Sequence, residues 1–79
     1  MNNETIGLSL RRWRLSNNLS QMQVSKAVGV SRPAVSMWEA GHNLPRDLAT
    51  LPDAYKMTRE QREDFAALVL GFRVTVVDR

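Results

Sequence analysis

Apolar side chains recur at intervals of three and four residues near the start of the chain. In IGLSLRRWRLS, Ile6, Leu10 and Trp13 keep this spacing while polar residues fill most other positions. The pattern predicts an amphipathic helix over residues 4–16, because residues so spaced share one face of an α-helix. The two asparagines that follow form a suitable stop, since asparagine tolerates the left-handed backbone that ends many helices.

A second helix is predicted directly after this stop. Ser20 and Gln23 have the spacing of a capping box, in which each side chain accepts from the other residue's backbone N–H. The helix should therefore begin at Gln21. Glycine at position 29 ends it, and its apolar stripe consists of Val24, Ala27 and Val28.

A third helix follows within a few residues. Ser31 can cap a helix from Arg32 to about Ala40, and Pro33 is tolerated in its first turn. Two helices joined by so short a turn pack only if they cross steeply, and the first residue of the turn then takes a left-handed backbone. Gly29 meets that requirement. The window also has the small and apolar positions of a helix-turn-helix: Ser25, Val24, Val28, Val30, Val35 and Trp38.

The remaining pattern predicts two more helices and a tail. Residues 48–55 keep helical spacing around Pro52, which predicts a short or kinked fourth helix. Thr58 and Gln61 repeat the capping-box spacing before a fifth helix over residues 59–70, which Gly71 should end. The tail FRVTVV is β-branched and partly alternating, which favours one strand. We therefore expect an all-α, compact five-helix domain over residues 1–71 and a C-terminal β-strand within residues 72–79.

The composition excludes several classes of protein. The chain has no cysteine and a single histidine, so neither a disulfide nor a cysteine-based zinc site can form, and we expect no metal and no cofactor. Its longest apolar run is too short to span a bilayer, and its first residues do not resemble a signal peptide. The sequence therefore predicts a soluble cytoplasmic protein without a membrane partner.

Charge is distributed unevenly along the chain. Residues 1–46 carry six basic and two acidic side chains, whereas residues 47–79 carry five basic and six acidic ones. Such a concentration of positive charge around the predicted helix-turn-helix suits a polyanionic partner. Glu60, Glu63 and Asp64 are interpreted as a solvated face. With no nucleophile, metal cluster or glycine-rich loop beside them, we expect no enzyme activity and no small-molecule ligand.

The chain resembles the Cro/repressor type of helix-turn-helix DNA-binding domain over about residues 6–51. The matching motifs are IGxxLRxWR, LSQ, VGVS and VSxWExG. The resemblance implies a five-helix bundle that binds operator DNA as a dimer. By position, Arg14 and Glu39 match an ion pair that joins the first helix to the end of the third, and Gln21 matches a phosphate-contacting residue. The base-facing positions are those of Arg32, Pro33, Ala34, Ser36 and Met37.

The residues themselves support base contacts from the third helix. With Val35 and Trp38 facing inward, the outward set is the base-facing one just named, with Ala34 at its margin. Arg32 is its one long donor and is suited to guanine, while the apolar members can contact a thymine methyl. We expect one dominant G·C position per half-site with A·T neighbours. The alternative for Arg32 is a phosphate contact or a solvated surface position.

Phosphate contacts are expected on both flanks of the third helix. The N-terminus of the second helix attracts an anion, and Gln21 stands there. On the other flank the loop with His42, Asn43 and Arg46 can grip the backbone. Alternatively, Gln21 is an ordinary first-turn residue and His42 a surface residue of the loop.

The predicted strand suggests how two copies would join. An unpaired apolar strand is an aggregation hazard, so antiparallel pairing of two tails through Phe72, Val74 and Val76 would cover it. That pairing would set two recognition helices about 34 Å apart, one turn of DNA. The tail could instead fold back on its own helices or pair with another protein.

The sequence therefore predicts a sequence-specific regulator of transcription that binds double-stranded DNA. We expect a homodimeric phage-type or mobile-element repressor that reads a palindromic operator through the major groove. The alternative is an antitoxin or protein-interaction module that neutralises a partner protein and binds DNA secondarily.

Overall fold

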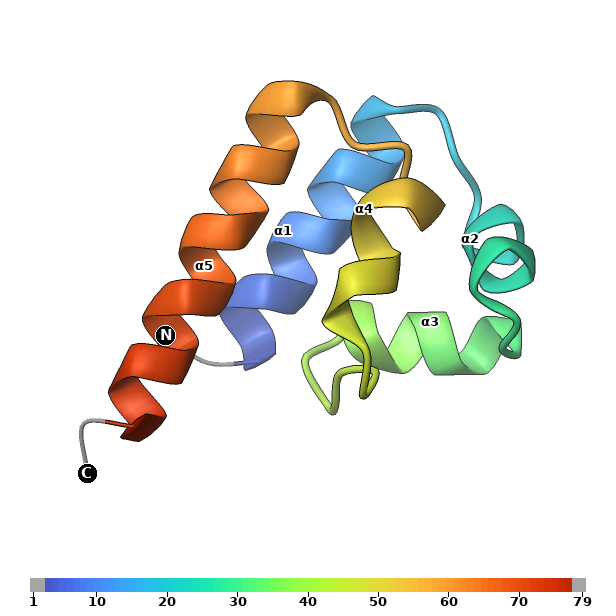
Figure 1. Ribbon diagram of the computed structural model, residues 1–79. Coiled ribbons are helices and arrows are strands. Elements are labelled where there is room, and N and C mark those ends of the chain that lie inside the picture. The colour runs from blue at the N-terminus through green and yellow to red at the C-terminus, as the bar shows by residue number, and fades with distance from the viewer. Residues whose placement is uncertain (1–2, 78–79) are drawn as a thin grey trace.

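A computed structural model describes the backbone of residues 3–77 and the side chains of residues 3–71. All regular secondary structure in this part of the chain is helical, as the sequence predicted for residues up to 71. Figure 1 shows α1 and α5 side by side, α2 and α3 at the other end of the molecule, and α4 between them. The elements are α1 (Asn3–Ser16), α2 (Gln21–Val28), α3 (Arg32–Glu39), the 3₁₀-helix η1 (Leu48–Thr50), α4 (Leu51–Ala54) and α5 (Arg59–Val77).

The predicted C-terminal strand is wrong. Between residues 3 and 77 no strand occurs, and α5 continues through Gly71 to Val77 over the segment that the sequence assigned to a strand. An isolated strand would leave its backbone N–H and C=O groups without partners, whereas a helix pairs them within the segment. This local pairing outweighs the β-preference of valine and threonine, which amounts to only about 1 kcal/mol.

The predicted helix starts and stops are confirmed up to Gly41. Ser20 Oγ accepts from the N–H of Gln23 at 3.0 Å, and Gln23 Oε1 accepts from the N–H of Ser20 at 2.7 Å. Asn18 has a left-handed φ of 59°, as expected for the stop after α1. A second capping box, Thr58 with Gln61, begins α5.

The fourth helix is short, as predicted, although Pro52 does not interrupt it. Asp47 caps η1 by accepting from the N–H of Ala49 at 3.1 Å, and η1 leads directly into α4. Pro52 lies in the first turn of α4, where the N–H that proline lacks has no intrahelical acceptor. Proline therefore helps to begin this helix.

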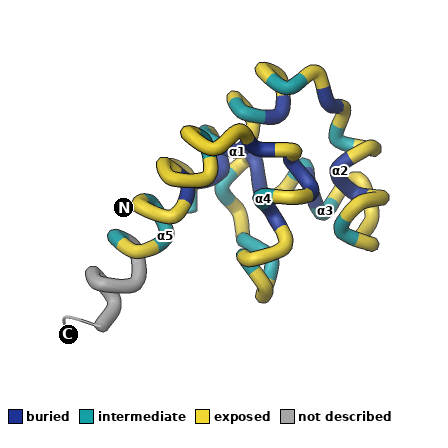
Figure 2. The backbone as a smooth tube through the Cα atoms, turned by 45° about the horizontal axis from the view of Figure 1, so that its top comes forward, coloured by how far each residue is buried: buried dark blue, intermediate teal, exposed yellow. Residues whose placement is uncertain are grey.

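One hydrophobic core joins all the helices. Figure 2 shows the buried positions where the helices face one another, with exposed positions along their outer sides. Trp13 extends the core towards α5, where its ring meets that of Phe65 edge to face at a centroid distance of 6.1 Å. Val28 is only partly buried, and Ala27 and Val30 are exposed, contrary to the apolar pattern. The buried apolar residues are Ile6, Leu10, Leu19, Val24, Val35, Trp38, Leu51, Ala54, Tyr55, Met57 and Phe65.

Candidate nucleic-acid interface

A tight turn holds α3 against α2. Gly29 has a φ of 87°, and the N–H groups of Gly29 and Val30 both donate to the carbonyl of Ser25, at 2.8 and 3.0 Å. Ser25 is 1% exposed, so the small side chain predicted for the close approach of the two helices is buried there. A residue with a Cβ atom rarely adopts this backbone, which explains the glycine. The turn leaves one whole side of α3 uncovered (Figure 1).

The sides of α3 divide as the sequence predicted. Val35 and Trp38 are buried, together with Glu39. The outward side presents Arg32, Pro33 and Met37 as exposed side chains, while Ser36 and Ala34 are half-buried. The five residues predicted to contact bases thus all reach the surface, and their contacts with DNA stay a prediction.

Glu39 lies at the centre of a buried polar cluster below α3. Arg14 donates to both of its carboxylate oxygens, from Nε to Oε2 at 2.8 Å and from Nη2 to Oε1 at 3.0 Å. Tyr55 Oη donates to Oε2 at 2.9 Å, and Gln21 Nε2 donates to Oε1 at 3.2 Å. Each oxygen therefore accepts two hydrogen bonds, which is what a buried carboxylate requires.

This cluster neutralises one of the two negative charges within residues 1–46. The structure places Arg14 and Glu39 in the ion pair that the resemblance implied, with both residues 8% exposed. The hydrogen bonds that Arg14 donates to Glu39, together with the charge of Glu39, raise the pKa of Arg14 above its ordinary value. Arg14 is therefore charged at any working pH and is not available to a phosphate. Among residues 3–46, Glu4 is left as the exposed carboxylate beside the exposed cations.

Gln21 connects the buried cluster to the outer surface of α3. Its amide group donates to Glu39 and accepts from Arg32, whose Nη1 lies 3.1 Å from Gln21 Oε1. Both ends of the amide are therefore engaged within the protein. Gln21 still stands at the start of α2, where the first backbone N–H groups have no intrahelical acceptor and favour an anion. Its predicted phosphate contact is untested, and its contact with Arg32 adds a positioning role.

The loop after α3 begins with a second left-handed glycine. Gly41 has a φ of 85°, and the N–H groups of Gly41 and His42 donate to the carbonyls of Trp38 and Met37 in the pattern of a Schellman motif. Glu4 of α1 packs against this turn, because a Cβ atom at position 41 would lie 2.8 Å from its Cγ. His42, Asn43 and Arg46 are exposed, so their predicted phosphate contacts remain open.

The residues predicted for dimerisation cannot be assigned contacts. Phe72, Val74 and Val76 belong to the helical backbone of α5, but their side chains lie outside the described residues. The strand pairing through which they were to join two copies is wrong, because the segment is helical.

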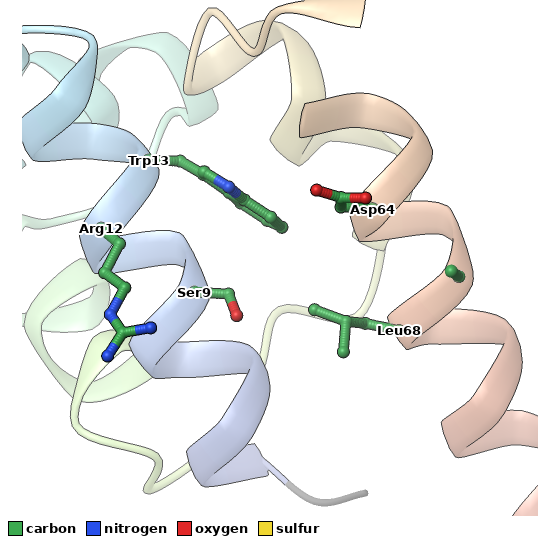
Figure 3. A pocket seen from close by; sticks show the side chains of 6 residues that line it. Ser9, Arg12, Trp13, Asp64 and Leu68 are labelled. Atoms are coloured by element: carbon green, nitrogen blue, oxygen red, sulfur yellow. The ribbon is translucent and has the colours of Figure 1, made fainter. Parts of the chain in front are cut away.

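Two shallow concavities lie away from the outer face of α3. One, of about 450 Å³, opens between α1 and α5; Figure 3 shows Trp13 reaching across from α1 towards Asp64 and Leu68 of α5, while Arg12 points away. The other, of about 380 Å³, lies between α5 and the η1–α4 segment and is mostly apolar. Among residues 3–71 no buried side-chain nitrogen or oxygen lacks a hydrogen bond, and no acids, histidines or cysteines cluster as metal ligands. The described residues thus offer α3 as the better candidate site.

Sequence reasoning missed the part that Tyr55 plays. The helical spacing of residues 48–55 placed it only in the predicted fourth helix, yet it is fully buried at the end of α4 and its hydroxyl donates to Glu39. Asn17, interpreted as a helix stop, also donates from Nδ2 to the Tyr55 carbonyl at 3.0 Å and to Gln61 Oε1 at 2.9 Å. No local signal encodes these contacts, because they join residues 16 or more positions apart.

The environment of Tyr55 predicts a loss of stability in alkali. Burial raises the pKa of Tyr55 well above its ordinary value of 10, and the negative charge of Glu39 raises it further. Above pH 10 the unfolded chain releases this proton while the folded chain keeps it, so the free energy of unfolding should fall as the pH rises. Urea unfolding at stepped pH checks this.

A matched variant isolates the tyrosine in that experiment. Tyr55 is the chain's single tyrosine, so tyrosinate absorption should appear only as the protein unfolds. Tyr55→Phe should be less stable at neutral pH but should lose less stability between pH 9 and pH 11. Tyrosinate absorption from the folded protein near pH 10 would contradict the assigned environment.

The comparisons with known proteins agree with this geometry. The family model of the helix-turn-helix domain matches residues 5–65, which include every helix up to the first turns of α5. No curated protein and no solved structure matches the chain significantly. Among the described residues, none of the helices combines the length and apolar character needed to cross a membrane.

Proposed function

The chain belongs to the helix-turn-helix domain family and is a DNA-binding regulator, and we propose that it acts as a homodimeric repressor that reads a palindromic operator in the major groove. The observation that carries the proposal is the outer face of α3, where an exposed arginine is hydrogen-bonded to Gln21 at the start of α2. The proposed role is binding without catalysis. A protein with this role acts in the cytoplasm, where its DNA is. The resemblance to the Cro/repressor type favours a phage or mobile-element source.

The charge distribution supports DNA as the partner. Because Arg14 neutralises Glu39, the outer side of α2, α3 and the following loop keeps Lys26, Arg32 and Arg46 as exposed cations. Apart from Glu4 and Asp47, the exposed acidic residues among residues 3–71 lie on α4 and α5, where Asp53 pairs with Arg62 at 3.0 Å. Affinity should therefore decrease as salt rises, through release of counterions from the phosphates.

The size of α3 supports a dimer. Its eight residues span about 12 Å, enough to face three or four base pairs. A sequence so short recurs by chance roughly every 60 to 260 base pairs, whereas a regulator must find its site among about 10⁶–10⁹ competitors. Two copies related by a two-fold axis would read two inverted half-sites about one helical turn apart. Occupancy of such a site can block a promoter using this interface alone.

Selection of bound duplexes from a random pool tests the proposal. The expected product is an inverted repeat with a guanine in each half-site and A·T pairs beside it. Arg32→Ala should then weaken binding to the selected site by about 1–3 kcal/mol and leave random DNA almost unaffected.

A second arginine gives the matched control. Arg46→Ala should weaken binding to selected and random duplexes alike and reduce the salt slope by about 1, as expected for a phosphate contact. Equal losses of affinity for selected and random duplexes with Arg32→Ala would show that Arg32 contacts a phosphate and not a base. A selected site without inverted symmetry would overturn the palindromic operator, and a pool without any enriched sequence would overturn specific recognition.

A further inference from the structure

The outer face of α3 consists of a polar row and an apolar row. Residues four apart lie above one another on a helix, so Arg32 and Ser36 form one row and Pro33 and Met37 the other. The polar row lies towards α2, where Arg32 donates to Gln21. The apolar row is open, with Pro33 exposed and Met37 43% exposed.

The apolar row has little with which to read hydrogen-bonding groups. Proline lacks a backbone N–H, and the methionine thioether is at best a weak acceptor. On the major-groove edges of the four standard bases, the apolar group is the C5-methyl of thymine. 5-Methylcytosine carries the same methyl on the same carbon, and differs from thymine there in an amino group that replaces O4.

We propose that α3 recognises a C5-methyl group beside the guanine read by Arg32, and that 5-methylcytosine can take the place of thymine at that position. The inference rests on the proposed function and names the chemical feature that the site reads. The Ser36 hydroxyl both donates and accepts, so it fits the carbonyl of thymine and the amino group of 5-methylcytosine equally. Between thymine and uracil, and between cytosine and 5-methylcytosine, the paired purine is the same, so the methyl is the feature that decides affinity within each pair. Methylation of cytosine then becomes a means of creating or strengthening a binding site.

Four duplexes separate the methyl from the rest of the base. In the selected site, each thymine is replaced in turn by uracil, which lacks only the methyl, and the same position is then tested with cytosine and with 5-methylcytosine. Burial of one methyl is worth about a three- to fourfold change in affinity. Uracil should therefore bind three- to fourfold more weakly than thymine, and 5-methylcytosine three- to fourfold more tightly than cytosine, at one position per half-site.

Two methionines of similar exposure provide the variant and its control. Met37→Ala should reduce both methyl ratios towards one. Met22→Ala, on α2 and 48% exposed, should preserve both ratios even if it changes the affinity for all duplexes. Circular dichroism melting of both variants shows that they remain folded, which is expected of exposed positions.

The outcomes distinguish this inference from the proposed function. Equal affinities for thymine and uracil, and for cytosine and 5-methylcytosine, on a site that still depends on Arg32 would overturn methyl recognition alone. A methyl effect that survives in the double variant Pro33→Ser with Met37→Ala would remove the apolar row as its source and overturn the inference as well. If uracil weakens binding but 5-methylcytosine binds no more tightly than cytosine, the claim that 5-methylcytosine can replace thymine is overturned. Failure to select any site overturns the proposed function and this inference together.

Discussion

Glu39→Ala should lower the free energy of unfolding by about 3–5 kcal/mol. The substitution leaves the Arg14 guanidinium buried, with only the Leu19 carbonyl, 3.0 Å from Nη1, still accepting from it. It also removes the acceptor of the buried Tyr55 hydroxyl and of the Gln21 amide. A small domain has a stability of about 5–15 kcal/mol, so this loss would leave the protein close to unfolding at physiological temperature.

A second glutamate in an ion pair provides the matched control. Glu63 of α5 pairs with Arg59 four residues before it at 3.5 Å, and the two side chains are 67% and 94% exposed. Because solvent screens such a pair, Glu63→Ala should change the free energy of unfolding by less than about 1 kcal/mol. Urea titration of both variants measures the difference in the free energy of unfolding. Equal losses in the two variants would show that the buried pair stabilises the protein no more than the exposed pair does.

Glu39→Ala should also impair DNA recognition in the fraction that stays folded. Gln21 would lose the partner of its Nε2 group, and the Oε1 that accepts from Arg32 would no longer be held in place. Below the unfolding temperature, we expect the ratio of affinities for selected and random duplexes to fall. Glu63→Ala should leave that ratio unchanged, since the Glu63 side chain is 67% exposed and pairs with Arg59 of its own helix.

Local sequence signals predicted the helix-turn-helix well. Ser20 with Gln23 and the glycine at position 29 act through hydrogen bonds and backbone angles within a few residues, so their spacing alone identifies them. The inward side of α3 followed from the same kind of pattern. Such short-range features fix where α3 begins and which of its sides is free.

Apart from the Arg14–Glu39 pair, which the resemblance implied, contacts between distant elements escaped the sequence. The carboxylate of Glu39 collects donors from α1, α2 and α4, and nothing in the sequence near Tyr55 or Gln21 indicates that they share one acceptor. The error at the tail has another cause. The β-branched residues after Gly71 favour a strand only if a second strand can pair with them, and α5 supplies their backbone partners by continuing as a helix.

Gly7 is the other position whose importance only the packing reveals. It is buried in α1, where that helix crosses the end of α3, and an added Cβ atom would overlap the Trp38 carbonyl oxygen and lie 3.0 Å from that of Glu39. These are backbone atoms at the C-terminal end of α3, so they cannot swing aside as a flexible side chain would. The glycine thus sets the distance between α1 and α3, and with it the position of Arg14 relative to Glu39.

Gly7→Ala should therefore destabilise the protein by about 3 kcal/mol, the upper part of the range for overpacking a tight contact. In an exposed helix the same change stabilises by about 1 kcal/mol, because alanine is the better helix former, so the two effects predict opposite signs. Gly29→Ala is the control: no atom lies within 4 Å of its added Cβ, and only its left-handed φ opposes the change, at a cost of about 1–2 kcal/mol. Thermal unfolding of both variants decides, and a rise in the melting temperature of Gly7→Ala would disprove the close contact between α1 and α3.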